Sequence, residues 1–176
     1  MNFIFNNFSD SYNFHDVVKE AGVQGFTEPD PKIDLSGVDV ARKILILIRE
    51  SGYEMEMEAI ENNCFLPQEC METTNNEDFF KSLTNHSSHF ENLLAEAKAK
   101  DCRIKFVASF DNGKASVGLQ FIPKESPFYN LEGKDNIVEF YTDRYIDQPL
   151  IIKGAGAGAA VTASGIFADV IRIGNV

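Results

Sequence analysis

Four charged residues in the first quarter of the chain could do chemistry together: Glu28, Asp34, Asp39 and Lys43. Asp39 and Lys43 are four residues apart, so on a helix they would share one face. The other two carboxylates lie just upstream, where the chain would deliver them to the beginning of that helix. Carboxylates can bind the amino group of a small molecule, and the lysine ammonium can donate a proton to a reacting oxygen.

A solvated ion pair with nearby loop acids is the ordinary interpretation of such residues, because exposed Asp–Lys pairs are common and contribute little stability. The helix that would carry Lys43 weakens this interpretation. Its middle, residues 44–48, is entirely apolar, which predicts a helix buried on most sides. A charged face on a buried helix needs polar surroundings, so the sequence favours a polar pocket.

Two local patterns would position these residues. Residues 27–31 read Thr-Glu-Pro-Asp-Pro, and each proline restricts both its own φ and the residue before it. This segment therefore predicts a stiff, extended connector. Ser36 is a suitable N-cap for the helix that follows, Asp39 suits the positive end of its dipole, and Gly52 predicts its end.

The rest of the chain mixes helical and strand patterns. Apolar spacing predicts helices over residues 14–21, 75–83, 87–100 and 157–173. Alternation predicts strands over residues 54–61, 104–110, 115–121, 137–141 and 150–152. The second and third of these form a hairpin around Asp-Asn-Gly at 111–113, in which residues 104, 106, 108 and 110 point inward and those between them outward. We expect one α+β domain, residues 1–176, with a mixed, largely antiparallel sheet packed against helices.

Composition excludes several classes of function. The 176 residues include 16 Lys plus Arg and 27 Asp plus Glu, a formal net charge of -11. Such a surface repels phosphate backbones and anionic lipids, so we expect no nucleic-acid or membrane partner. The uncharged stretch 154–168 is shorter than the roughly 20 residues of a membrane span, and the N-terminus does not resemble a signal peptide. The odd number of cysteines, without a CxxC pair, predicts reduced thiols and a cytoplasmic location.

Other candidate residues carry weaker signals. His86 and His89 could share a metal ion at a helix start, but no third ligand is evident, which favours surface histidines and no metal site. Cys64 and Cys70 have no base nearby in the sequence, which favours ordinary packing over a nucleophile.

The C-terminal glycines fit the G-x-G-x-x-A fingerprint at residues 154–159 only formally. A dinucleotide site would need a following strand and an acidic residue about 20 positions on, and the chain has neither. A tight strand-to-helix turn explains these glycines.

Residues 25–43 resemble a known signature. They read Gly-Phe-Thr-Glu-Pro-Asp-Pro-Lys-Ile-Asp-Leu-Ser-Gly-Val-Asp-Val-Ala-Arg-Lys and are similar to the motif of homoserine dehydrogenases. The opening Asn-Phe-Ile-Phe at residues 2–5 and the tail at residues 154–169 resemble other parts of the same family. The resemblance implies an enzyme that reduces L-aspartate 4-semialdehyde to L-homoserine with NAD(P)H, on the route to threonine and methionine.

The resemblance also implies residue roles. Lys43 matches the catalytic lysine, which donates a proton to the carbonyl oxygen. Asp39 matches a substrate-binding carboxylate that orients this lysine, and Glu28 matches a residue that binds the substrate amino group. Asp34 belongs to the same substrate-binding group of acids. Gly25 and Gly158 match family glycines at which the backbone approaches the cofactor or the substrate.

Departures from the family pattern sharpen these expectations. The family begins with a Rossmann domain, and nothing precedes Met1, so we expect NAD(P) to be bound mainly by a missing N-terminal domain. On that expectation the chain by itself is inactive. Its tail resembles the C-terminus of bifunctional aspartokinase/homoserine dehydrogenases. The family often has Tyr at the position of Phe26, which removes any hydroxyl role there.

The sequence therefore leaves two hypotheses for the function. The first is the catalytic domain, which the resemblance implies to be a homodimer that pairs through its sheet. The alternative is a non-catalytic oligomerisation or amino-acid-sensing module derived from it. The retained group of Glu28, Asp34, Asp39 and Lys43 argues against the alternative, because a module freed from catalysis has no reason to keep an amine among carboxylates.

Overall fold

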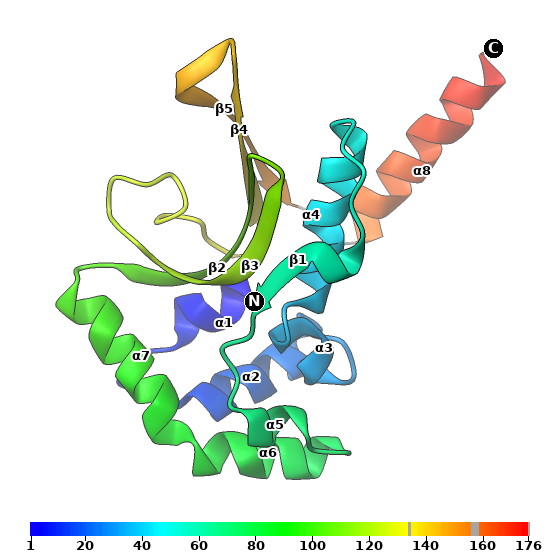
Figure 1. The fold of residues 1–176 in the computed structure, drawn as a ribbon. Coiled ribbons are helices and arrows are strands. Elements are labelled where there is room, and N and C mark those ends of the chain that lie inside the picture. The colour runs from blue at the N-terminus through cyan, green and yellow to red at the C-terminus, as the bar shows by residue number, and fades with distance from the viewer. Residues whose placement is uncertain (134, 156–158, 176) are drawn as a thin grey trace. The chain divides into compact units, whose positions relative to one another are not determined.

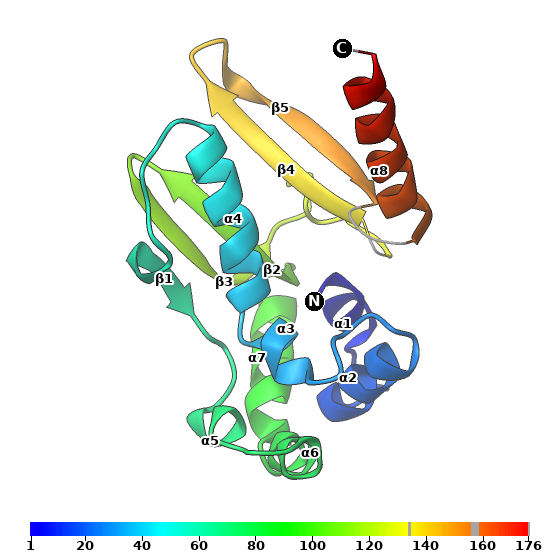
Figure 2. The same cartoon turned by 90° about the vertical axis from the view of Figure 1, so that its right-hand side faces the viewer.

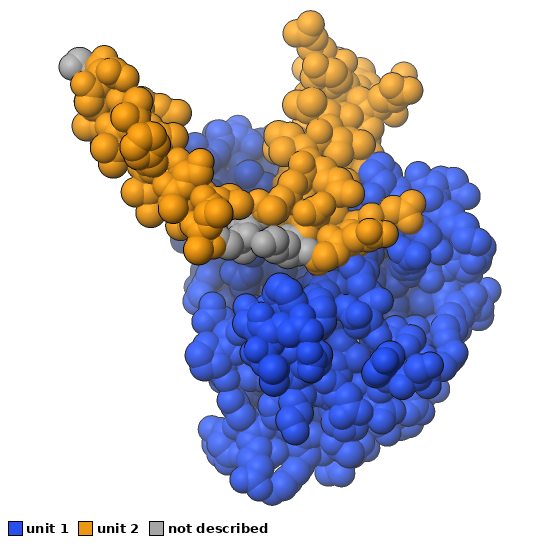
Figure 3. Space-filling view, turned by 180° about the vertical axis from the view of Figure 1, so that it is seen from behind, with its two compact units in different colours: residues 1–129 blue, residues 130–176 orange. Residues whose placement is uncertain are grey.

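The computed structural model describes residues 1–133, 135–155 and 159–175 (Figure 1). The chain forms two compact units, Met1–Tyr129 and Asn130–Val176, which are coloured blue and orange in Figure 3. No helix among the described residues has the length and apolar character that crossing a membrane requires.

The first unit is mostly helical, with one small sheet. Its elements in chain order are α1 (Asn2–Asn7), α2 (Phe14–Val23), α3 (Pro31–Leu35), α4 (Val38–Glu50), the 3-10 helix η1 (Met57–Ala59), β1 (Ile60–Asn63), α5 (Gln68–Met71), α6 (Asn76–Asn85), α7 (Ser87–Ala99), β2 (Arg103–Asp111) and β3 (Lys114–Ile122). The second unit contains β4 (Asp135–Thr142), β5 (Tyr145–Ala155) and α8 (Ala159–Gly174).

The sheet of the first unit has the strand order β1-β3-β2. β2 and β3 are antiparallel, whereas β1 runs parallel to β3, so the predicted mixed, largely antiparallel sheet is confirmed. The predicted hairpin is confirmed as well. Asn112 and Gly113 both have positive φ, at 47° and 78°, which is the backbone that an Asn-Gly hairpin turn requires.

Two hydrophobic clusters build the core of the first unit. One is aromatic and lies mainly among α1, α2, α6 and α7, where the rings of Phe14 and Phe90 stack with centroids 4.1 Å apart. In the other, α4 packs against the sheet (Figure 2). Its buried residues are Ala41, Leu45, Ile48, Ile60, Ala115 and Val117.

The expectation that α4 is buried on most sides is wrong. Ala41, Leu45 and Ile48 face the core, but Ile46 in the middle of the apolar run is exposed. α4 lies on one face of a sheet, so only one stripe of its surface is covered.

The predicted strand over residues 54–61 is wrong in its bounds, because β1 begins only at Ile60. The preceding segment is held by α4 instead of by a neighbouring strand. Arg49 donates from Nε to the Met55 carbonyl at 3.0 Å and forms an ion pair with Glu56 at 2.8 Å.

The second unit confirms the last two predicted strands and, from residue 159 on, the predicted final helix, whose first two positions lie outside the described residues. β4 and β5 form an antiparallel pair with Val138 opposite Ile152, and α8 follows. Among its described residues only Leu131 is a buried hydrophobic, and the apolar side chains of β5 and α8 are mostly exposed.

Candidate functional site

A short helix organises the segment that carries Glu28 and Asp34. Asp30 is the N-cap of α3 and accepts a hydrogen bond from the Lys32 backbone N–H at 3.0 Å. Pro31 occupies the first helical position, where a missing N–H costs nothing. Residues 27–30 are non-helical as predicted, but Pro31 and Asp34 belong to a helix.

Asp34 closes this segment on itself. Its Oδ2 accepts a hydrogen bond from the backbone N–H of Glu28 at 2.8 Å. The carboxylate therefore fixes the backbone from which the Glu28 side chain projects. The Glu28 side chain is exposed, whereas Asp34 is partly buried.

The same connector is tied to a distant part of the chain. Lys32 Nζ donates to the Thr73 carbonyl at 2.5 Å, and Asn76 Nδ2 donates to the Pro29 carbonyl at 2.7 Å. Both partners belong to the α5–α6 segment, more than forty residues away in sequence. The sequence analysis did not predict these two contacts, because no local pattern indicates a contact between residues so far apart in the chain.

A tight turn joins α3 to α4. The N-cap of α4 is Gly37, not Ser36 as predicted, because Ser36 is already the C-cap of α3. Gly37 has a φ of 83°, and a Cβ there would lie 2.6 Å from the Phe106 ring and 2.9 Å from Asn62 Oδ1. Asn62 Nδ2 also donates to the Ser36 carbonyl at 2.9 Å. Sheet residues thus hold this turn closely.

Asp39 and Lys43 share one face of α4, as their spacing predicts. Asp39 Oδ2 and Lys43 Nζ are 2.8 Å apart, and the side chains are 44% and 63% exposed. This face is the solvent side of α4, so the argument from a buried helix is wrong. The case for a site rests instead on the elements that converge here.

α1 is one of these elements. Burial lowers the pKa of the Met1 amino group, which also interacts electrostatically with Asp34, Lys43 and Asp39. The ring centroids of Phe3 and Phe26 lie 4.7 Å apart. The beginning of α1 is therefore next to the charged residues of α3 and α4. We name Glu28, Asp34, Asp39 and Lys43 the acid–amine cluster.

The two glycines matched by the resemblance differ in what the structure describes. Gly25 has a φ of 72°, and no heavy atom would lie within 4 Å of a Cβ there. The backbone is open at this turn, which is compatible with the approach of a ligand. Gly158 lies outside the described residues.

The histidines outside the cluster are used by the fold. His86 Nδ1 lies 2.9 Å from the Ser82 carbonyl, and His89 Nε2 lies 2.8 Å from the Phe65 carbonyl. In the part of the chain that the structure describes, no three His, Cys, Asp or Glu side chains are grouped so that they could hold a metal ion.

Cys70 has a base nearby after all, because its Sγ lies 4.0 Å from His86 Nδ1. Sequence reasoning missed this pair, which is sixteen residues apart. Cys70 is fully buried, burial raises the pKa of its thiol, and Ser82 Oγ donates to its sulfur at 3.2 Å. A buried, mostly protonated thiol is a poor nucleophile, so packing remains its role.

Comparison with known proteins decides the family. The sequence profile described as homoserine dehydrogenase matches residues 1–171. The chain belongs to the homoserine dehydrogenase family. It is 43% identical over 177 residues to bifunctional aspartokinase/homoserine dehydrogenase 2, chloroplastic, from Arabidopsis thaliana, covering 99% of this chain and 19% of that protein. It is 41% identical over 164 residues to homoserine dehydrogenase from Schizosaccharomyces pombe, covering 92% of this chain and 44% of that protein.

A solved structure supports the fold independently. Homoserine dehydrogenase from S. aureus superposes with a TM-score of 0.72 at 24% identity, over 98% of this chain and 40% of that one. The predicted family and α+β fold are confirmed. The chain spans about one fifth of its plant relative and less than half of its fission-yeast relative.

Proposed function

We propose that both units of this chain form the catalytic, substrate-binding and dimerisation domain of a homoserine dehydrogenase. Within the intact protein it takes part in the NAD(P)H-dependent reduction of L-aspartate 4-semialdehyde to L-homoserine. The observation that carries this proposal is the Asp39–Lys43 pair at 2.8 Å, which belongs, like the Glu28–Asp34 hydrogen bond, to the segment that resembles the family signature.

Lys43 is the proton donor in this proposal. When NAD(P)H is bound it supplies the hydride, and negative charge then develops on the substrate carbonyl oxygen. The Lys43 ammonium stabilises that charge and protonates the oxygen. Asp39 holds the Nζ atom at 2.8 Å and limits its freedom, so the proton is presented from one direction.

Glu28 and Asp34 bind the other end of the substrate. An ammonium group is recognised by carboxylates because charge-assisted hydrogen bonds to them are short and strong. Glu28 is exposed and free to turn toward the substrate, whereas Asp34 fixes the Glu28 backbone at 2.8 Å. Asp34 therefore contributes by placing Glu28 as well as by its own charge.

The family uses NAD(P), and two glycines of this chain are proposed to lie at the edge of the cofactor site. The open backbone at Gly25 can approach a cofactor, and Gly158 is proposed to act likewise. Two glycines do not hold a dinucleotide, which needs a phosphate-binding turn and a ribose-binding acid. Most of the NAD(P) contacts are therefore proposed to come from a part of the protein outside this chain.

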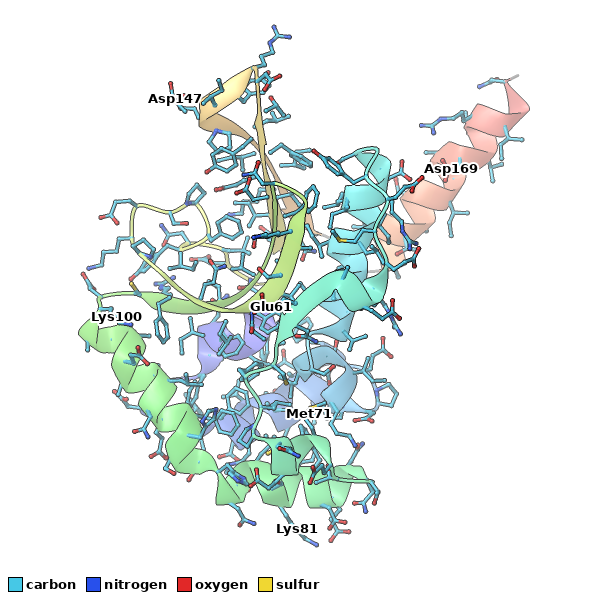
Figure 4. The ribbon with its side chains drawn as sticks, viewed as in Figure 1. Glu61, Met71, Lys81, Lys100, Asp147 and Asp169 are labelled. Atoms are coloured by element: carbon cyan, nitrogen blue, oxygen red, sulfur yellow. The ribbon has the colours of Figure 1, made fainter. Side chains whose placement is uncertain are left out.

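Lys43 offers a sharp test, because the chain contains a matched control. Lys43 and Lys81 are both 63% exposed, and each pairs with an acid one helical turn earlier, at 2.8 Å and 2.7 Å. Lys81 projects from α6 into solvent (Figure 4). In the intact protein, Lys43→Ala should lower kcat for homoserine oxidation about a hundredfold or more without changing the melting temperature. Lys81→Ala should behave as wild type.

Wild-type turnover by Lys43→Ala would show that the assigned role is wrong. If the wild-type protein does not oxidise homoserine at all, the non-catalytic module becomes the better hypothesis. Calorimetric titration with homoserine and with threonine then tests that alternative directly.

The homodimer is proposed to form through the sheet of β4 and β5, because the large apolar side chains of β5 are exposed. Ile152→Asp places a charge on this surface, and sedimentation should then give a monomer where wild type gives a dimer. Val23→Asp, at an exposed apolar residue of α2, is the control. A dimer that survives Ile152→Asp would show that the interface lies elsewhere.

A cytoplasmic location is proposed from the three free cysteines, and cell fractionation checks it.

A further inference from the structure

A buried lysine lies beneath α1. Lys105 in β2 is 4% exposed, and among the described residues it is the one charged residue that is buried. The alternation of the hairpin predicts that Lys105 points outward, and this prediction is wrong. Burying an ammonium group costs free energy unless protein hydrogen bonds replace those it made to water, so Lys105 needs polar partners.

Two asparagines of α1 bind this ammonium group. Lys105 Nζ donates to Asn2 Oδ1 at 2.8 Å and to Asn6 Oδ1 at 2.5 Å. Asn2 and Asn6 are four residues apart, so they lie on the same face of the helix. Two charge-assisted bonds, one at each end of a six-residue helix, determine both its rotation and its position along the axis.

Apolar contacts alone would attach α1 to the core without determining its exact placement. Ile4 is fully buried and Phe8 nearly so in the aromatic cluster. Such burial is favourable in many orientations, because the hydrophobic effect is non-directional. The hydrogen bonds of Lys105 supply the direction that burial lacks.

α1 in turn contacts the acid–amine cluster. Phe3 packs on Phe26 with centroids 4.7 Å apart, and Phe26 lies two residues before Glu28. Met1, just before α1, lies near Asp34, Asp39 and Lys43. A displacement of α1 would therefore be transmitted both to the connector that carries Glu28 and to the charged face of α4.

We infer that Lys105 is a positioning residue: through Asn2 and Asn6 it holds α1 in the one placement that aligns Glu28 with the Asp39–Lys43 pair. The inference rests on the proposed function and extends it to a residue that touches neither substrate nor cofactor. A displacement of about 1 Å at a reacting group can lower a rate about a hundredfold, so a modest shift of α1 would be visible in kinetics.

The test compares Lys105→Met, Lys105→Arg and Lys114→Met in the intact protein. Met keeps the apolar stem of Lys105 and removes its donors, whereas Arg keeps a cation with several donors. Lys114→Met makes the same change at an exposed position of the same hairpin. We expect Lys105→Met to lower kcat/KM for homoserine about a hundredfold, with a raised KM for homoserine and an unchanged KM for NAD(P). Lys105→Arg should recover most of the loss, and Lys114→Met should match wild type.

Hydrogen exchange provides a readout that does not depend on turnover. The Glu28 N–H is bonded to Asp34, so peptides covering residues 24–34 report the placement of the connector. These peptides should exchange faster in Lys105→Met than in wild type or in Lys114→Met. Exchange in α7 should stay unchanged, which excludes general unfolding.

The outcomes separate the two proposals. If wild type is active and Lys105→Met keeps wild-type KM and kcat with only a lower melting temperature, Lys105 is structural and the inference is overturned. Unchanged exchange over residues 24–34 overturns it as well, whether or not the protein is active. A wild type without homoserine oxidation overturns the proposed function, and the catalytic part of the inference is overturned with it.

Discussion

The two units of this chain use similar apolar sequences in opposite ways. In Met1–Tyr129 many large apolar side chains form a core, with Phe79, Phe90 and Ile4 almost completely buried. In Asn130–Val176 most of the apolar residues of β5 and α8 are exposed. A two-stranded hairpin and one helix offer too little surface to cover each other's apolar groups, whereas seven helices and a sheet can build a core.

This difference shows that the type of a secondary-structure element and its burial are separate properties, although one apolar pattern is used to predict both. Alternation and helical spacing identify most of the long strands and helices in both units, because they depend on local geometry. Stability depends on what covers the apolar face, and only the first unit provides that cover from its own residues. The second unit is therefore suited to contacts with other surfaces, including the proposed dimer partner.

A matched pair of phenylalanines gives the largest expected contrast. Phe90 in α7 is 1% exposed and Phe167 in α8 is 66% exposed. Phe90→Ala should lower the free energy of unfolding by about 3–5 kcal/mol, because it leaves a cavity among packed rings. Phe167→Ala should change it by less than about 0.5 kcal/mol. Urea unfolding of the 176-residue chain, followed by circular dichroism, measures both. Equal losses would show that α8 is as well covered as α7.

A pair of glycines gives smaller individual effects, which have opposite signs. Gly37→Ala should destabilise by about 2–4 kcal/mol, because its φ is 83° and the new Cβ would meet the Phe106 ring at 2.6 Å. Gly165 lies within α8, and no heavy atom would lie within 4 Å of its Cβ. Gly165→Ala should therefore stabilise by about 0.5–1 kcal/mol through helix propensity. The same urea titration measures both, and a destabilising Gly165→Ala would reveal a neighbour packed on that face.

Much of this protein follows from its sequence alone. The Asn-Gly turn, the bounds of α2, α6 and α7 within a few residues, and the α+β class follow from local rules of φ, capping and periodicity. The long motif at residues 25–43 was enough to indicate the family and to name the acid–amine cluster. These features are local in the chain, so a linear pattern records them.

Only the tertiary structure decided how those residues are held. Asp34 binds the backbone of Glu28, Thr73 and Asn76 hold the connector, and Lys105 lies under α1. The alternation of β2 predicted that Lys105 faces water, because periodicity describes which side of a strand is apolar and not what packs on the other side. Helix α4 shows the reverse, since its all-apolar middle is covered on one face only. Burial is decided by partners distant in sequence, and no local pattern contains them.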